Sequence, residues 1–87
     1  MKQEQITCRL RQLRRREGLI QPVLAVYANK ILTELGAQGY GLTGDIISLA
    51  ENEKIVLIPD HVHAIATFLN CSAHDIYPML YEEDGCG

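Results

Sequence analysis

The histidines and cysteines of this sequence are its candidate metal ligands. Cys71 and His74 have a spacing that metal ligands use, but no second pair completes a tetrahedral site. His61 and His63 lie two residues apart on a predicted helix, so their side chains point about 200° apart and cannot share an ion. We therefore expect no metal and no cofactor. Cys71 is expected as a small apolar residue at a helix junction, and His74 as an exposed polar one.

No arrangement of a nucleophile and a base indicates catalysis. A catalytic serine or cysteine needs an activating base within reach, and no such pair is evident. The glycine-rich segment 36–41 does not match a phosphate-binding loop, which needs a preceding strand and a helix at a fixed offset. The sequence predicts a protein that is not an enzyme and that has no evident small-molecule substrate.

Residues 42–54 combine a hydroxyl N-cap, Thr43, with a short apolar helix over 44–52 that ends in the polar residues Glu51 and Asn52. This pattern is typical of the recognition helix of a helix-turn-helix, which small DNA-binding domains place in the major groove. Its outward positions lack the Arg, Lys, Asn and Gln side chains that best read base edges; they are Gly44, Asp45, Ile46 and Leu49. Any sequence preference is expected to be low or to come from DNA shape.

The charge of the chain is divided between its two halves. The net charge is −3, but residues 1–54 hold all eight Lys and Arg against six acids, whereas residues 55–87 hold five acids and no base. Only the first half is therefore expected to approach phosphates.

Length and composition predict one folded domain over residues 1–87, with a structured core over roughly 5–81 and an acidic tail over 82–87. No apolar run approaches the roughly 18–20 residues that cross a bilayer, and the first residues lack the hydrophobic core of a secretory signal. Three cysteines would leave one unpaired, which favours reduced thiols in a cytoplasmic protein.

The first predicted helix spans residues 5–17, with Ile6, Leu10 and Leu13 on its inner face and Gly18 at its end. The rest of its surface carries arginines that could be simply solvated or could contact phosphates: Arg9, Arg11, Arg14, Arg15 and Arg16.

A second helix is predicted from Pro22 to Leu35, with Gly36 as its stop. Its core stripe is expected to be Leu24, Ala28, Ile31 and Leu35. Further apolar residues outside or beside this stripe indicate a second packing surface, against the following loop or another copy of the chain; they are Val23, Val26, Tyr27 and Leu32.

The remaining elements follow from turn and cap residues. Residues 36–41 are a loop, and residues 55–58 form either a short strand or an extended loop over the core. Asp60 caps a helix over 61–70 that buries Val62, Ile65, Ala66 and Leu69. Ser72 starts a last helix through a capping box with Asp75, burying Ile76 and Leu80. We expect an all-α, five-helix orthogonal bundle.

Three segments carry a family pattern. Residues 9–25 read RLRQLRRREGLIQPVLA, residues 42–52 read LTGDIISLAEN, and residues 65–77 read IATFLNCSAHDIY. They are similar, in the same order, to RLRxLRxxxGLTQxxLA, GVSxxTISxIENG and IAxxLNCSxDDIY. The sequence thus resembles the Cro/C1-type helix-turn-helix family, the phage-repressor-like DNA-binding domains.

The resemblance implies a bundle of the lambda-repressor-like type, with departures. The distance from Gln21 to Thr43 is nearly twice the family's, which implies an extended second helix and an inserted Gly-rich loop. Ile20 stands where the family has a Thr cap, and Glu53 stands where a Gly closes the recognition helix.

The resemblance also assigns roles by position. The residues that would hold the DNA backbone are Arg11, Arg15, Gln21, Thr43, Asn52 and Lys54. The base-reading positions would be Gly44, Asp45, Ile46 and Leu49. Arg14 and Glu51 would form an internal ion pair between the first helix and the end of the third.

These observations favour a small transcriptional regulator of the repressor type, which binds double-stranded DNA as a homodimer. The alternative is a protein–protein interaction module, an antirepressor or regulatory partner, on a scaffold that no longer reads DNA. In that interpretation the surplus apolar face of the second helix and residues 55–58 form the contact surface.

Overall fold

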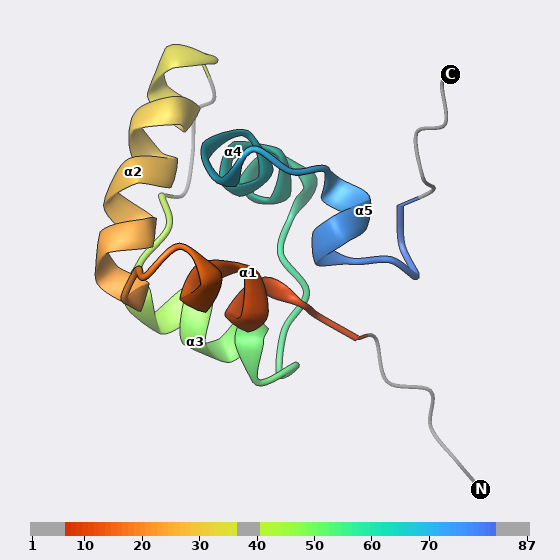
Figure 1. Cartoon of the computed structure of the whole chain (residues 1–87). Helices are drawn as coiled ribbons and strands as arrows, with labels where there is room; N and C mark the ends of the chain where they lie inside the picture. Colours follow the sequence, from red (N-terminus) through yellow and green to blue (C-terminus); the bar gives the residue numbers. More distant parts are fainter. Residues whose placement is uncertain (1–6, 37–40, 82–87) are drawn as a thin grey trace, which may run out of the picture.

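The computed structural model describes residues 7–36 and 41–81. Within these ranges the chain forms five α-helices and no strand (Figure 1), which confirms the predicted all-α class. The helices are α1 (Leu10–Arg16), α2 (Gln21–Glu34), α3 (Gly44–Glu51), α4 (Pro59–Leu69) and α5 (Ala73–Ile76). Of the two forms left open for residues 55–58, the structure has an extended link without a strand. None of the described helices has the length and apolarity needed to cross a membrane.

The longest helix, α2, organises the packing. It contacts α3 along one side and α4 along another, while α1 packs on α3 and α5 packs on α4 (Figure 1). Every helix contributes to one apolar core, because each has at least one residue that is fully buried or nearly so. The largest fully buried side chains are those of Tyr77, just after α5, and of Leu10, Leu24, Ile47, Val62, Ile65 and Ile76 in the helices.

The predicted start and stop signals of several helices are confirmed. Gly18 and Gly36 follow α1 and α2 with φ of +72° and +77°, the left-handed conformation in which a Cβ is unfavourable. The hydroxyl of Thr43 accepts a hydrogen bond from the Ile46 amide and so caps α3. Ser72 and Asp75 form the predicted capping box at α5.

The first helix is shorter than predicted. It begins at Leu10 rather than at residue 5, and Ile6 lies outside the described residues. The cause is tertiary: the Arg9 amide donates to the Ile76 carbonyl at 2.9 Å, and the Cys8 amide donates to the Glu53 carboxylate at 3.1 Å. Because these amides are bound to α5 and to Glu53, just after α3, residues 7–9 run as a link and not as a helical turn.

The buried stripe of α2 also differs from the prediction. Leu24 and Ala28 are fully buried and Ile31 is half-buried, but Leu35 is 66% exposed because the helix has already ended there. Leu32, placed outside or beside the stripe by the sequence, is 6% exposed. The buried face of α2 therefore includes Leu32 and excludes Leu35.

The last two helices need smaller corrections. Helix α4 begins at Pro59, with Ile58 as its N-cap, so Asp60 lies in the first turn and does not cap it. The four residues predicted to face inward are all buried. After α5 the core residue is Tyr77, with Leu80 46% exposed, because the Tyr77 hydroxyl turns inward to accept a hydrogen bond from the Leu57 amide at 3.1 Å.

Titration of Tyr77 should be visible in the stability of the fold. Burial raises the pKa of Tyr77 from 10.0 to about 12, although the hydrogen bond from the Leu57 amide opposes this. The folded state thus favours the neutral phenol, a contribution that is complete below pH 10 and lost as the pH rises through the folded pKa. Urea titrations at a series of pH values measure this effect. Between pH 10 and about 12 we expect the free energy of unfolding to fall more steeply with pH in the wild type than in Tyr77→Phe. Equal slopes would contradict the assignment.

Candidate nucleic-acid interface

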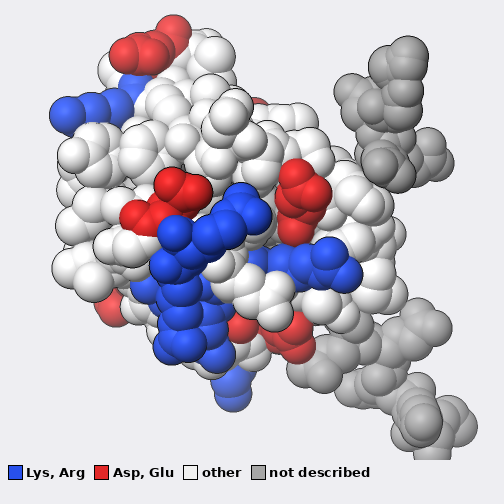
Figure 2. Space-filling view, in the orientation of Figure 1, with Lys and Arg blue, Asp and Glu red and all other residues white. Residues whose placement is uncertain are grey.

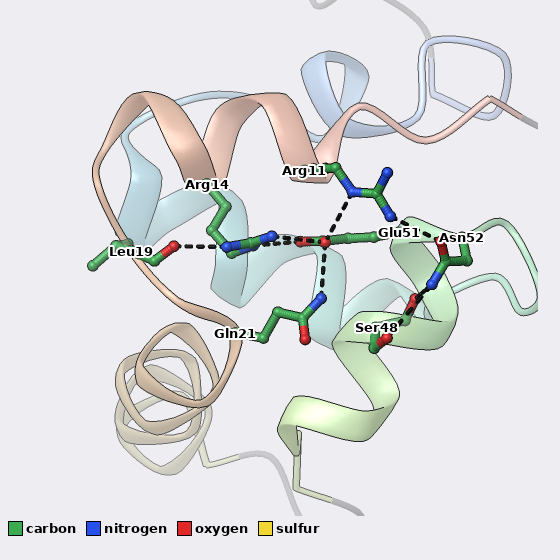
Figure 3. Close-up of polar contacts among 7 residues, drawn as sticks. All are labelled: Arg11, Arg14, Leu19, Gln21, Ser48, Glu51 and Asn52. Carbon is green, nitrogen blue, oxygen red and sulfur yellow. Dashed lines mark hydrogen bonds and ion pairs between the residues drawn. The ribbon is translucent and has the colours of Figure 1, made fainter.

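One buried carboxylate, Glu51, joins the end of α3 to α1 and α2 (Figure 3). Its side chain is 0% exposed. Arg14 holds it with two hydrogen bonds, from Nε to Oε2 at 2.5 Å and from Nη2 to Oε1 at 2.9 Å. Gln21, the first residue of α2, donates from Nε2 to Oε1 at 3.0 Å. Three helices therefore meet at a single acidic group.

The spacing of residues along each helix explains why these polar groups face inward. Arg14 lies one turn after the fully buried Leu10, and Glu51 lies one turn after the fully buried Ile47. A lone charge at such a position would be costly, but the bidentate pair satisfies both ions. Arg14 also donates from Nη1 to the Leu19 carbonyl at 2.7 Å, which fixes the turn between α1 and α2.

The protonation of the pair follows from these bonds. Burial alone raises the pKa of Glu51, but the hydrogen bonds from Arg14 and Gln21, with the charge of Arg14, outweigh it, so the pKa lies below its ordinary value. The hydrogen bond to Glu51 raises the pKa of Arg14. Both groups are therefore charged at neutral pH.

A chain of polar contacts that runs from Arg11 through Asn52 to Ser48, the polar relay, lies at the surface beside this pair. Arg11 approaches Glu51 with Nε at 3.5 Å, and its Nη2 donates to Asn52 Oδ1 at 2.8 Å. Asn52 in turn donates from Nδ2 to the Ser48 carbonyl at 2.9 Å (Figure 3). The Arg11 side chain remains 42% exposed. Its guanidinium is thus held in one orientation while part of it faces solvent.

The residues expected at the DNA backbone divide into two groups. Arg11, Gln21 and Asn52 are joined through the Glu51 network, whereas Arg15, Thr43 and Lys54 are exposed. Gln21, expected to hydrogen-bond a phosphate, donates from its amide nitrogen to Glu51 within the protein. Arg15 lies four residues after Arg11 and therefore on the same side of α1.

The face of α3 that solvent reaches is narrower than predicted. Asp45 is exposed and Leu49 is 44% exposed. Ile46 is half-buried against the core, and Gly44 lies so close to α2 that a Cβ there would sit 3.4 Å from Pro22.

Sequence reasoning missed Ser48, which is half-buried and lies beside Asn52. Its position three residues after Asp45 and four before Asn52 could have indicated it.

The arginines of α1 do not form one uniform ring. Figure 2 shows Lys and Arg side chains gathered on the face over α1, with acidic side chains around them. Arg14 is buried, and Arg11 lies toward the end of α3. Arg16 pairs loosely with Glu17 at 3.9 Å.

The candidate metal ligands are not brought together. Within residues 7–36 and 41–81 no group of three or more His, Cys, Asp or Glu side chains is arranged to hold a metal ion. His61 is buried and His63 is exposed, so the two do lie on different sides of α4. His74 is half-buried, not exposed as predicted, because its Nδ1 lies 2.7 Å from the Tyr81 carbonyl.

The cysteine thiols in the described residues are free. Cys8 and Cys71 are half-buried, and burial raises the pKa of both. Cys71 packs against the core near the end of α4, as a small apolar residue would. Cys86 and the acidic tail 82–87 lie outside the described residues, as does most of the glycine-rich loop.

Comparisons with known proteins identify no relative: no protein-family model matches the chain, and no curated protein or solved structure is significantly similar to it. The interface is therefore interpreted from its own residues.

Removing the charge of Glu51 should destabilise the fold strongly. Glu51→Gln leaves Arg14 buried without its counter-ion, for which we expect a loss of about 3–5 kcal/mol in the free energy of unfolding. The matched control is Glu17→Gln, which breaks the exposed pair with Arg16 and should change stability by less than about 1 kcal/mol. Urea titrations of both variants at neutral pH measure the difference.

The same variant should alter the response to acid. Because the pKa of Glu51 is below its ordinary value of 4.5, its stabilisation is present above pH 4.5 and is lost as the pH falls through the folded pKa. Glu51→Gln should therefore lose less stability on acidification than the wild type does. A steeper loss in the variant would contradict the buried ion pair.

Proposed function

We propose that the protein binds double-stranded DNA, with α3 as the recognition helix of a helix-turn-helix within an orthogonal bundle of the Cro/C1 type. The observation that supports this most is the Glu51 network. It fixes the end of α3 against α1 and α2 while Asp45 and Leu49 stay exposed. A helix held rigidly with one side open to solvent is the arrangement that groove binding needs.

Electrostatic attraction to phosphates would supply most of the affinity. Arg11 has an oriented, partly exposed guanidinium beside the end of α3, and Lys54 is exposed two residues after Asn52. Arg15 adds a third cation on the same side of α1. In this proposal Asn52 acts through Arg11, whose orientation it fixes, and Gln21 acts through Glu51.

Base recognition would rest on few side chains. Asp45 has a carboxylate that can accept a hydrogen bond from a cytosine amino group, and Leu49 can contact a thymine methyl. Ser48, beside them on the same helix, can donate or accept. Because none of these makes the bidentate contact that discriminates best, much of the preference for one DNA over another would come from its shape.

In the cell such a protein would act as a small transcriptional regulator of the repressor type. Two copies would bind half-sites about one helical turn apart, so that dimerisation sets the spacing of the operator.

A second candidate function is supported by exposed apolar side chains. On α2, Val26 is 55% and Tyr27 41% exposed, and in the link before α4, Val56 is 46% and Ile58 47% exposed. Exposed apolar residues in such numbers are typical of surfaces that contact another protein. In that case the chain would be an interaction module, an antirepressor or a regulatory partner, that does not bind DNA.

A salt titration distinguishes the two functions. Fluorescence anisotropy of a labelled random duplex should report binding at low salt, weakening as NaCl is raised. Three phosphate-binding cations in each protomer predict a slope of log K against log [NaCl] of about −3 per protomer. No binding at the lowest salt would exclude the DNA proposal and favour the protein-partner function.

Two arginines of α1 provide a matched test of the proposed docking face. Arg11→Ala and Arg16→Ala each remove one charge from the same helix, but only Arg11 lies beside α3 and Asn52. We expect Arg11→Ala to weaken binding to all sequences and to reduce the salt slope by about 1, with little change for Arg16→Ala. If both variants lose affinity equally, the arginines act as a diffuse charge and α3 is not the docking face.

A further inference from the structure

Asn29, in the middle of α2, is bonded to the chain just before α3 through both ends of its side-chain amide. Its Nδ2 donates to the Leu42 carbonyl at 2.8 Å, and its Oδ1 accepts from the Leu42 amide at 2.7 Å. One side chain therefore satisfies both backbone groups of one residue, as a neighbouring strand would. This contact lies at the start of α3, whereas the Glu51 network holds the end of that helix.

The residues around Leu42 are consistent with a close attachment. A Cβ at Gly41 would lie 3.2 Å from Asn29 Oδ1, tighter than an ordinary contact, so glycine suits this approach of the chain to α2. The Leu42 side chain is 3% exposed in the core. The next residue, Thr43, caps α3 by accepting from the Ile46 amide. Fixing the backbone of Leu42 therefore fixes the place where α3 begins.

Helix propensity alone does not explain an Asn at this position. Asn is a weaker helix former than Ala or Leu, because its side chain competes for nearby backbone groups. Here the side chain makes its bonds outside its own helix, to a residue thirteen positions further along the chain. Thr33, one turn later, donates its hydroxyl back to the Asn29 carbonyl of the same helix, at 3.0 Å.

We propose that Asn29 is a positioning residue that sets the start of α3 and so orients its exposed side chains for DNA. The attachment itself follows from the contacts above, while its effect on DNA binding rests on the proposed function. The family pattern quoted for the resemblance does not include this residue, because its first segment ends at residue 25 and its second begins at residue 42.

Hydrogen exchange tests the attachment without DNA. Asn29→Ala removes both bonds, so the protection of the Leu42 amide should fall about tenfold or more relative to that of Ile65 in the core. Thr33→Ala is the matched control on the same helix and should leave Leu42 protection unchanged. An unchanged Leu42 amide in Asn29→Ala, or an equal loss in Thr33→Ala, would overturn the inference.

Asn29→Asp adds a readout that a general loss of stability would not give. At neutral pH the introduced carboxylate can accept from the Leu42 amide but repels the Leu42 carbonyl. At pH about 4 and below, protonation of an ordinary Asp supplies the missing donor. Leu42 protection relative to Ile65 should therefore recover on acidification in Asn29→Asp and not in Asn29→Ala. Parallel behaviour of the two variants would count against the paired geometry.

Anisotropy with the random duplex then tests the consequence for binding. Asn29→Ala should weaken the affinity about tenfold with an unchanged salt slope, because no phosphate contact is removed. If Leu42 protection falls while the affinity does not change, Asn29 only holds the loop and its positioning role is wrong. If the wild type binds no DNA, the proposed function fails, and Leu42 exchange still decides whether the attachment exists.

Discussion

The arrangement of α1, α2 and α3 depends on keeping one buried carboxylate charged. Glu51 is fully enclosed, so it needs Arg14 and Gln21 to replace the water that it has lost. Those partners come from two other helices, and satisfying the charge therefore fixes the relative positions of all three. Apolar contacts alone would tolerate small rotations of α3, whereas a bidentate pair does not.

This constraint has a consequence for the surface. With Glu51 and Ile47 turned inward, the opposite side of α3 carries Asp45 and Leu49. Arg11 reaches the same end of the helix and is oriented by Asn52. The internal network and the exposed polar relay are thus connected through Arg11. Arg16, on the same helix, instead pairs loosely with its exposed neighbour Glu17.

The two ends of α3 are held by different kinds of contact. At its end the attachment is ionic and buried, and at its start it is a neutral amide bonded to backbone at Leu42. Glu53, just after the helix, takes a φ of +62°, a conformation that a glycine adopts more easily. Its carboxylate accepts from the Cys8 amide, and this bond to the segment before α1 offsets part of the strain. The unusual backbone conformation of Glu53 is thereby matched by a specific partner, the Cys8 amide.

The sequence by itself determined the class of the fold, the caps at Thr43 and Ser72 and the glycine stops at Gly18 and Gly36, because these features depend on local backbone preferences. It also indicated the inward face of α4 through its period. Tertiary structure decided where α1 begins, which side of α2 is buried, that Tyr77 and not Leu80 enters the core, and that Gln21 turns toward Glu51. Those outcomes depend on partners distant in the chain, and a local pattern holds no information about which distant group will satisfy a given donor.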